Sequence, residues 1–123
     1  MIEVGDVKSL ENGSKGLVFS VELKDADQDN STVPAFAIRF NDEIFVYKNI
    51  CGHIAVNLDF MPGQFFDDEG QHLVCATHGA LYEANTGKCL GGPCYGVGLE
   101  KLNHIIQDNI LYITDETIVA VNR

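Results

Sequence analysis

Cys51-Gly52-His53 and Cys75-Ala76-Thr77-His78 are two short segments of this sequence, and each offers one thiol and one imidazole. The two segments are separated by 21 residues, 54–74. A random chain with the same number of Cys and His residues would contain both patterns in about 2% of cases. Thiolates and imidazoles are common ligands of transition metals in proteins. The two segments therefore predict a metal site built from Cys51, His53, Cys75 and His78.

The order of the ligands separates two kinds of metal site. A structural zinc site tends to pair like residues in each arm, two Cys in one and two His in the other. Here both arms are mixed, with Cys first. Two irons that share two sulfides accommodate mixed arms, because one iron takes both Cys and the other takes both His. We therefore favour a two-iron centre and keep a zinc-binding structural or interaction module as the alternative of another class.

A longer stretch around the two segments resembles a known family. C-x-H followed by C-x-x-H-G, completed by Gly79, is similar to the signature of Rieske-type 2Fe-2S ferredoxins. Downstream, Tyr82, the turn at 85–88 and the run Gly91-Gly92-Pro93 resemble the strand, turn and proline loop that cover the cluster in that family. The resemblance spans residues 51–93.

The resemblance implies one Rieske-type 2Fe-2S cluster with a defined set of neighbours. Its metal ligands would be Cys51, His53, Cys75 and His78. Further cofactor contacts would come from the hydroxyl of Tyr82 and from Gly92 and Pro93 in the proline loop, where the small glycines let backbone amides approach a sulfide closely. The spacer between the motifs is several residues longer than the family usually has, and we expect extra turns at 61–63 and 67–70.

The hydrophobic pattern predicts strands and no sustained helix. The expected strands are 16–23, 35–40, 43–48, 72–75, 99–106, 110–114 and 118–121. Polar turns at Asn41-Asp42 and Gln107-Asp108-Asn109 predict two hairpins. The acidic stretch 24–34 predicts a mobile loop. With the resemblance, we expect an all-β fold of stacked antiparallel sheets, in which residues 1–123 form a single Rieske domain and 50–95 a small cluster-binding subdomain.

The charge and hydropathy of the chain limit its partners. Eighteen acidic and eight basic residues give a formal net charge of -10, and this argues against nucleic acid, which requires a basic footprint. A partner with a basic docking patch suits the chain better. No run approaches the roughly 18 apolar residues of a membrane span, and the N-terminal residues lack a signal-peptide pattern. We therefore expect no membrane partner and a cytoplasmic location.

The resemblance implies a soluble one-electron carrier and not an enzyme. Such a carrier takes electrons from a flavin-dependent reductase and delivers them to a terminal oxygenase. The 123 residues leave no room for the 2-His-1-carboxylate iron site of an oxygenase subunit. The alternative within the family is a small subunit of a larger reductase complex, similar to that of assimilatory nitrite reductase. The sequence names neither the partner enzymes nor the oligomeric state.

Other residues near the motifs refine this picture. High-potential relatives carry a Ser two residues after the second His, where this chain has Ala80, so we expect a potential in the lower part of the Rieske range. Ile54, Ala55 and Leu81 flank the histidines without charge, and we expect them to form a small apolar docking contact.

The remaining Cys and His residues are expected to play no part in metal binding. Cys89 and Cys94 could form a disulfide, but in a reducing cytosol we expect free thiols. His72 and His104 have no Cys at ligand spacing, so we expect them to be solvent-exposed or locally hydrogen-bonded.

Overall fold

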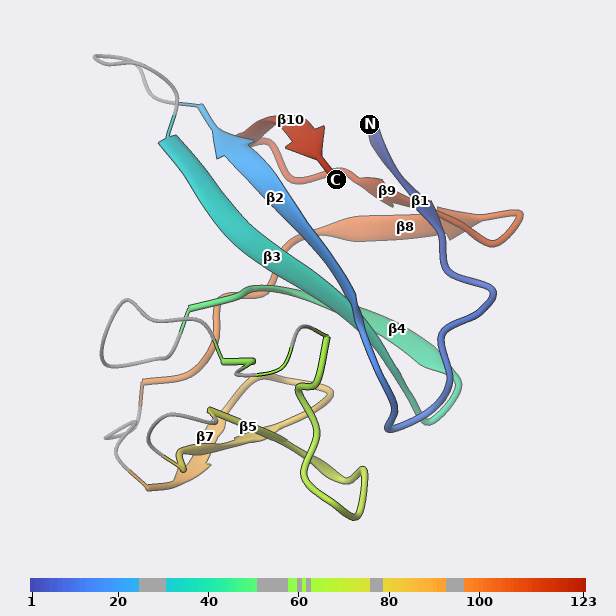
Figure 1. The fold of residues 1–123 in the computed structure, drawn as a ribbon. Coiled ribbons are helices and arrows are strands. Elements are labelled where there is room, and N and C mark those ends of the chain that lie inside the picture. Colours follow the sequence, from blue (N-terminus) through green and yellow to red (C-terminus); the bar gives the residue numbers. More distant parts are fainter. Residues whose placement is uncertain (25–30, 51–57, 60, 62, 76–78, 93–96) are drawn as a thin grey trace.

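The computed structural model describes residues 1–24, 31–50, 58, 59, 61, 63–75, 79–92 and 97–123. Within this part of the chain there is no helix, and ten strands form three antiparallel sheets (Figure 1). The strands are β1 (Ile2–Asp6), β2 (Leu17–Leu23), β3 (Ser31–Phe40), β4 (Glu43–Lys48), β5 (His72–Val74), β6 (Leu81–Glu83), β7 (Cys89–Gly91), β8 (His104–Gln107), β9 (Ile110–Ile113) and β10 (Ile118–Asn122). The predicted all-β fold is confirmed.

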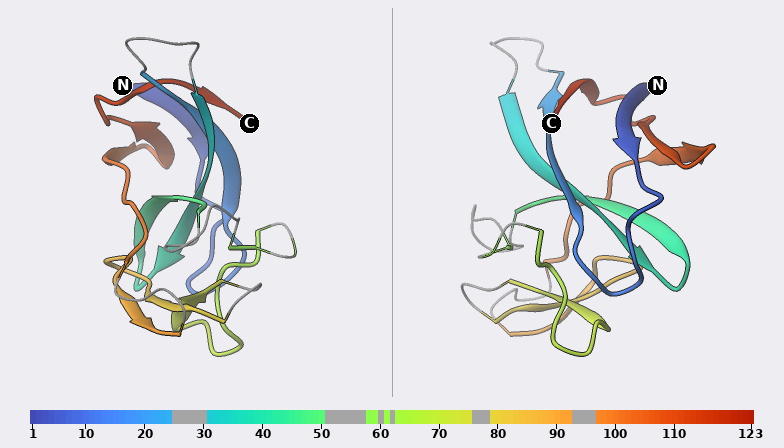
Figure 2. Two further views of the ribbon diagram at one scale, coloured as in Figure 1. Left: turned by 90° about the vertical axis from the view of Figure 1, so that its left-hand side faces the viewer. Right: turned by 45° about the vertical axis from the view of Figure 1, so that its right-hand side comes forward.

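A four-stranded sheet, in the order β10-β2-β3-β4, forms the middle of the molecule. The sheet β1-β9-β8 shares a hydrophobic core with one of its faces, and the sheet β5-β6-β7 shares a second core with the other. Figure 2 shows β5 to β7 at one end of the molecule, with both chain termini toward the opposite end. The stacked sheets therefore create two separate cores.

Strand β3 supplies side chains to both cores because successive side chains point to opposite faces of a sheet. Ala35 and Ala37 belong to the core beneath β1, β8 and β9. Phe36 and Ile38 belong to the core toward β5, β6 and β7. All four side chains are fully buried, so the hydrophobic run at 35–38 marks the strand covered on both sides.

Two hairpins depend on residues that tolerate the left-handed backbone region. Asn41 and Asp42 join β3 to β4 with φ angles of 51° and 66°. Asp108 and Asn109 join β8 to β9 with φ angles of 53° and 64°. Two consecutive positive φ angles match the twist of the flanking strands, and Asn and Asp adopt them most readily after Gly. Both predicted hairpins are confirmed.

The predicted strand at 99–106 begins too early, because β8 starts only at His104. Before that point the chain runs along β4 with irregular pairing. Lys48 donates its amide to the carbonyl of Glu100 at 2.9 Å, and Leu102 donates to Val46 at 2.9 Å. The apolar residues of this segment are therefore buried by contact with β4 rather than by a regular sheet ladder.

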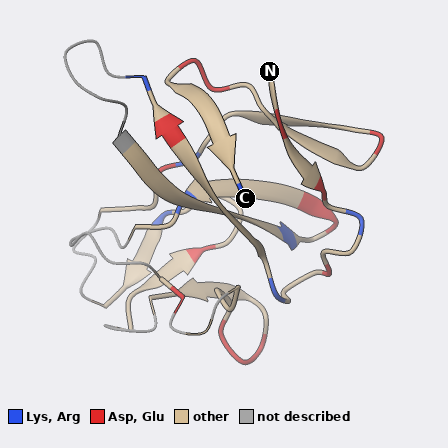
Figure 3. Cartoon of the chain, turned by 45° about the horizontal axis from the view of Figure 1, so that its top comes forward, with Lys and Arg blue, Asp and Glu red and all other residues tan. Residues whose placement is uncertain are grey.

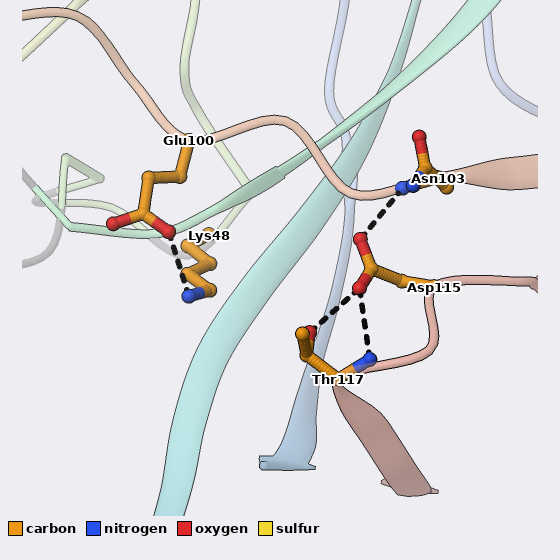
Figure 4. Close-up of polar contacts among 5 residues, drawn as sticks. All are labelled: Lys48, Glu100, Asn103, Asp115 and Thr117. Carbon is orange, nitrogen blue, oxygen red and sulfur yellow. Dashed lines mark hydrogen bonds and ion pairs between the residues drawn. The ribbon is translucent and has the colours of Figure 1, made fainter. Parts of the chain in front are cut away.

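Side chains fix this returning segment to the central sheet (Figure 4). Lys48 Nζ lies 2.7 Å from the Glu100 carboxylate. Asp115 accepts a 3.2 Å hydrogen bond from the amide of Asn103 and bonds from the amide and hydroxyl of Thr117. These contacts hold the chain where it comes back from the sheet β5-β6-β7.

The predicted loop at 24–34 is shorter than expected. Residues 31–34 belong to β3, and Pro34 pairs in register with Ser20 of β2. The proline lacks an amide hydrogen, and it is tolerated because β4 ends at Lys48, which pairs with Ala35. Residues 25–30 lie outside the described part of the chain.

Candidate metal centre

The second motif begins with a cysteine in the core next to β6. Cys75 follows β5 directly, and its side chain is fully buried in the core that also contains Leu73 and Tyr82. Its amide donates to the carbonyl of Ala80 at 2.9 Å, while the amide of Gly79 donates to the Cys75 carbonyl at 2.7 Å. These two hydrogen bonds join Cys75 to Gly79 and Ala80, and the thiol of Cys75 lies in the protein interior.

Glycines let two segments meet at this turn. Gly79 has a φ of 73° and Gly92 a φ of 80°, values at which a side chain would be strained. A Cβ atom on Gly92 would lie 3.0 Å from Ala80 Cα and 3.0 Å from the Gly79 carbonyl oxygen. Gly92, which follows β7, therefore packs directly on the backbone at the end of the second motif. Such close packing of backbone segments is what a cluster that accepts hydrogen bonds from backbone amides would require.

The described residues thus fit a buried cluster with one thiolate ligand on the protein side. The other three predicted ligands, Cys51, His53 and His78, lie outside the described residues, as does Pro93. The role of all four residues, Cys75 included, as metal ligands stays a prediction. Among the described residues, no group of three or more His, Cys, Asp or Glu side chains gathers as a metal site.

Tyr82 is the central residue of the three-stranded sheet that carries Cys75. It pairs with Leu73 of β5 and with Cys89 of β7, and it is fully buried. Its ring lies in the same hydrophobic core as Cys75. The predicted contact of Tyr82 with the cofactor stays a prediction.

Cys89 differs from the expectation of a free thiol, because it is disulfide-bonded in this structure. The expectation was based on the redox compartment, which says nothing about local geometry. Cys89 stands on β7, where its neighbours are fixed by pairing with β6. Cys94 lies outside the described residues.

The two histidines outside the motifs behave as predicted. His72 Nδ1 lies 3.3 Å from Asp67 Oδ2, and its side chain is 45% exposed. Burial acts to raise the pKa of Asp67, but hydrogen bonds from the amides of Gln71 and His72 and from the His72 ring outweigh it, so the pKa falls below its ordinary value. His104 lies 3.2 Å from the carbonyl of Leu102 and 3.0 Å from that of Ile44.

The expected extra turns are present in the spacer. Gln64 donates its amide to Met61 at 2.9 Å, and Gly70 donates to Asp67 at 3.0 Å. Between these turns Phe65 stacks on Phe36 of the central sheet with ring centroids 3.9 Å apart. The longer spacer therefore covers the core rather than leaving the second motif unsupported.

The sequence did not predict a role for Asn49 and Asp59, which lie before and after the first motif. Asn49 is 1% exposed and bonds to the side chain of Asp59 and the amide of Leu58. The available signal was the two-residue alternation of β4, which puts Asn49 on the same face as Tyr47 when it is continued. A polar residue at that buried position requires partners of its own.

Charge is spread over the surface around this centre. Figure 3 shows acidic residues in turns and at strand ends on several sides of the molecule. Leu81 and Leu90, on neighbouring strands of the sheet that carries Cys75, are 37% and 46% exposed. The predicted apolar neighbours Ile54 and Ala55 lie outside the described residues. The part of the chain that the structure describes holds no helix that could cross a membrane.

Comparisons with known proteins agree with this geometry. The family model described as the Rieske [2Fe-2S] domain matches residues 2–105. No curated protein sequence matches the chain.

Solved structures with a similar fold come from electron-transfer proteins. The ferredoxin of carbazole 1,9a-dioxygenase from Nocardioides aromaticivorans IC177 has a TM-score of 0.66 at 16% identity, covering 94% of this chain and all of its own. A chain in the complex of reduced oxygenase and oxidized ferredoxin of carbazole 1,9a-dioxygenase has a TM-score of 0.62 at 18% identity, covering 92% and 100%. The plasma membrane Rieske protein PetC3 from Synechocystis PCC 6803 has a TM-score of 0.57 at 18% identity, covering 93% and 99%.

Proposed function

The chain belongs to the Rieske [2Fe-2S] domain family, and from that membership we propose that it carries single electrons from a flavin-dependent reductase to a terminal oxygenase. The domain holds one Rieske-type 2Fe-2S cluster, which takes up and releases one electron. A ferredoxin of similar fold is that of a dioxygenase. This similarity supports the electron path that we propose.

The ligands in this proposal are Cys51 and His53 from the first motif and Cys75 and His78 from the second. The observation that carries the assignment is the position of Cys75, buried at the start of a closed turn on which Gly92 packs. Tyr82, Gly92 and Pro93 are proposed as further neighbours of the cluster. We also propose that residues 50–95 act as the cluster-binding subdomain of a single domain, 1–123.

The reductase and oxygenase are proposed to dock at the end of the molecule that carries β5, β6 and β7. Exposed Leu81 and Leu90 supply apolar contact area there. The net charge of -10 favours partners with basic surfaces. Reduction by the reductase should therefore slow as ionic strength rises, and stopped-flow kinetics across a salt series test this. We place the carrier in the cytoplasm, and cell fractionation tests that location.

Metal analysis is the first experiment for the ligand set. The purified protein should contain two irons and two acid-labile sulfides per chain. Cys51→Ser and His78→Ala should lose the cluster, whereas Cys89→Ala should keep it. If Cys89→Ala bleaches the protein while His53→Ala retains full iron, the ligand assignment is wrong.

Reconstitution then tests the electron path. The reduced protein should support turnover of a terminal oxygenase when a flavin-dependent reductase and NADH are added. A large subunit that co-purifies in a stable complex would instead favour the small-subunit role in a nitrite reductase-like enzyme.

A further inference from the structure

A buried asparagine stands directly before the first motif. Asn49 is the residue after β4, and its side chain is 1% exposed. Its Oδ1 accepts a 2.8 Å hydrogen bond from the amide of Leu58, and its Nδ2 donates a 2.8 Å bond to Asp59 Oδ1. Its own amide donates to the carbonyl of Pro34 at 2.7 Å. Asn49 is thus fixed to the central sheet by its backbone and to residues 58 and 59 by its side chain.

The carboxylate of Asp59 extends this connection. Its second oxygen, Oδ2, accepts a 3.0 Å hydrogen bond from the amide of Gly63. The carbonyl of Gly63 in turn accepts a 2.8 Å bond from the amide of Gly16, the residue directly before β2. The side chains of the Asn49–Asp59 pair therefore take part in three hydrogen bonds, one between them and two from backbone amides, and the chain on both sides of the pair is tied to the central sheet.

The pair closes the base of the segment that holds two of the four proposed ligands. Cys51 and His53 lie between Asn49 and Leu58 in the sequence. We propose that Asn49 and Asp59 are positioning residues, which hold the two ends of this segment together so that Cys51 and His53 are in place for the cluster. This inference rests on the proposed ligand set.

The physical reason is preorganisation. Ordering a loop costs conformational entropy, and a metal site whose ends are already closed loses less of it when the metal binds. Hydrogen bonds fix direction as well as distance, so a polar pair specifies one arrangement of the chain ends where an apolar contact would allow several. Leu58 and Asn49 are both buried, so the bond from the Leu58 amide to Asn49 is shielded from water, and the two bonds to Asp59 are partly shielded.

Exchanging the two side chains tests the pair directly. In the Asn49→Asp variant, two carboxylates would face each other across the present 2.8 Å bond. In Asp59→Asn, the new amide can offer its oxygen to Asn49 or to Gly63 but not to both. The double variant Asn49→Asp/Asp59→Asn restores all three bonds. The new carboxylate at position 49 then accepts from the amide of Leu58 and from the new side-chain amide at position 59, whose oxygen accepts from Gly63.

A second Asn–Asp pair in this chain provides a matched control. Asn12 Nδ2 donates to Asp42 Oδ1 at 2.9 Å, and the Asp42 amide donates to Asn12 Oδ1 at 2.8 Å. This pair is exposed and lies at the β3–β4 hairpin. The Asn12→Asp variant makes the same chemical change, carboxylate against carboxylate, away from both motifs.

The measurement is the rate at which the purified holoprotein loses its visible cluster absorbance in excess EDTA, together with the electron paramagnetic resonance line width of the reduced protein. Asn49→Asp should lose iron about tenfold faster than the wild type and show broader lines, with Asp59→Asn in between. The double variant should return to within about twofold of the wild-type rate, and Asn12→Asp should match the wild type.

The iron-loss rate of the double variant decides whether the positioning role holds. If the double variant releases iron as fast as Asn49→Asp, or if neither single variant differs from wild type, the positioning role is refuted. If Asn49→Asp does not fold, Asp59→Asn and the double variant still make the comparison. Wild-type protein that lacks two irons and two sulfides would overturn the ligand set itself, and the positioning role with it, and iron analysis separates that result from a failed rescue.

Discussion

The hydroxyl of Tyr47 donates a 2.7 Å hydrogen bond to the carbonyl oxygen of Ala84. Tyr47 stands on β4 of the central sheet, and Ala84 follows β6, so the bond joins the sheet that carries Cys75 to the rest of the molecule. Both residues are buried. The colours of Figure 1 follow the sequence, and they change from green at β4 to yellow in the segment after β5, so the bond joins two parts of the chain that are well separated in sequence.

Removing that hydroxyl should destabilise the fold. Tyr47→Phe leaves the buried carbonyl of Ala84 without its donor, and we expect the free energy of unfolding to fall by about 1–3 kcal/mol. Urea unfolding followed by circular dichroism measures the change. Tyr112→Phe is the control, because Tyr112 is only partly buried on β9, and its change should stay within about 0.5 kcal/mol. Equal losses in both variants would contradict the role of the Tyr47 bond.

The same tyrosine predicts a pH dependence. Burial, and then the negative charge of Glu83, raise the pKa of Tyr47 far above its ordinary value of 10.0. A raised pKa means that the folded state keeps the proton while the unfolded state loses it above about pH 10, so the stability is complete below that pH and declines above it. The Tyr47→Phe variant lacks this decline.

The stability curves of wild type and Tyr47→Phe should therefore converge in alkali. Wild type should be the more stable protein from about pH 8 to 9.5, and its advantage should shrink by up to about 1.4 kcal/mol per pH unit above about pH 10. Urea midpoints measured at half-unit steps give the curves. A constant difference from about pH 8 to 11 would rule out the buried, neutral phenol.

The two adjacent glycines at the end of β7, Gly91 and Gly92, should respond differently to an added methyl group. Gly92→Ala puts a Cβ 3.0 Å from the backbone of Gly79 and Ala80 at a φ of 80°, so the second motif must shift. We expect faster cluster loss and altered electron paramagnetic resonance g-values. Among the residues that the structure describes, no atom lies within 4 Å of the Cβ that Gly91→Ala would add, so this variant should behave as wild type. Identical behaviour of the two variants would show that the approach of Gly92 to the motif is unimportant.

The reduction potential should lie in the lower part of the Rieske range of about -150 to +300 mV. Ala80 is fully buried and its carbonyl accepts from the Cys75 amide, so a hydroxyl there would enter the interior next to the second motif. Hydrogen bonds to cluster sulfur raise the potential. Protein-film voltammetry should therefore show an upward shift in Ala80→Ser. A wild-type potential above about +200 mV would contradict this expectation.

The sequence predicted those parts of the fold that are determined by residues adjacent to one another in the chain. Asn41-Asp42 and Asp108-Asn109 define their hairpins because two-residue turns select residues that tolerate a positive φ. The strand β1 was missed because its partner in the sheet, β9, lies about a hundred residues away in the sequence. The three-residue strands β6 and β7 are too short to show a two-residue period.

The same distinction applies to the metal centre. Spacing alone predicted the ligand residues, because the chemistry requires Cys and His at fixed separations within each motif. The contact between Asn49 and Asp59 could not be predicted, since it depends on how the chain returns to its starting point after residues 50–57. The disulfide of Cys89 likewise depends on geometry rather than on residue counts.

The small side chains of Ala35 and Ala37 on one face of β3, and the large ones of Phe36 and Ile38 on the other, divide the interior into two compartments. Substitutions on opposite sides of a sheet share no packing neighbours, so their effects on stability should add. The stability of the carrier could therefore be tuned from the alanine side separately from its redox centre. The compartment beneath Cys75, and with it the redox properties of the centre, would be left intact.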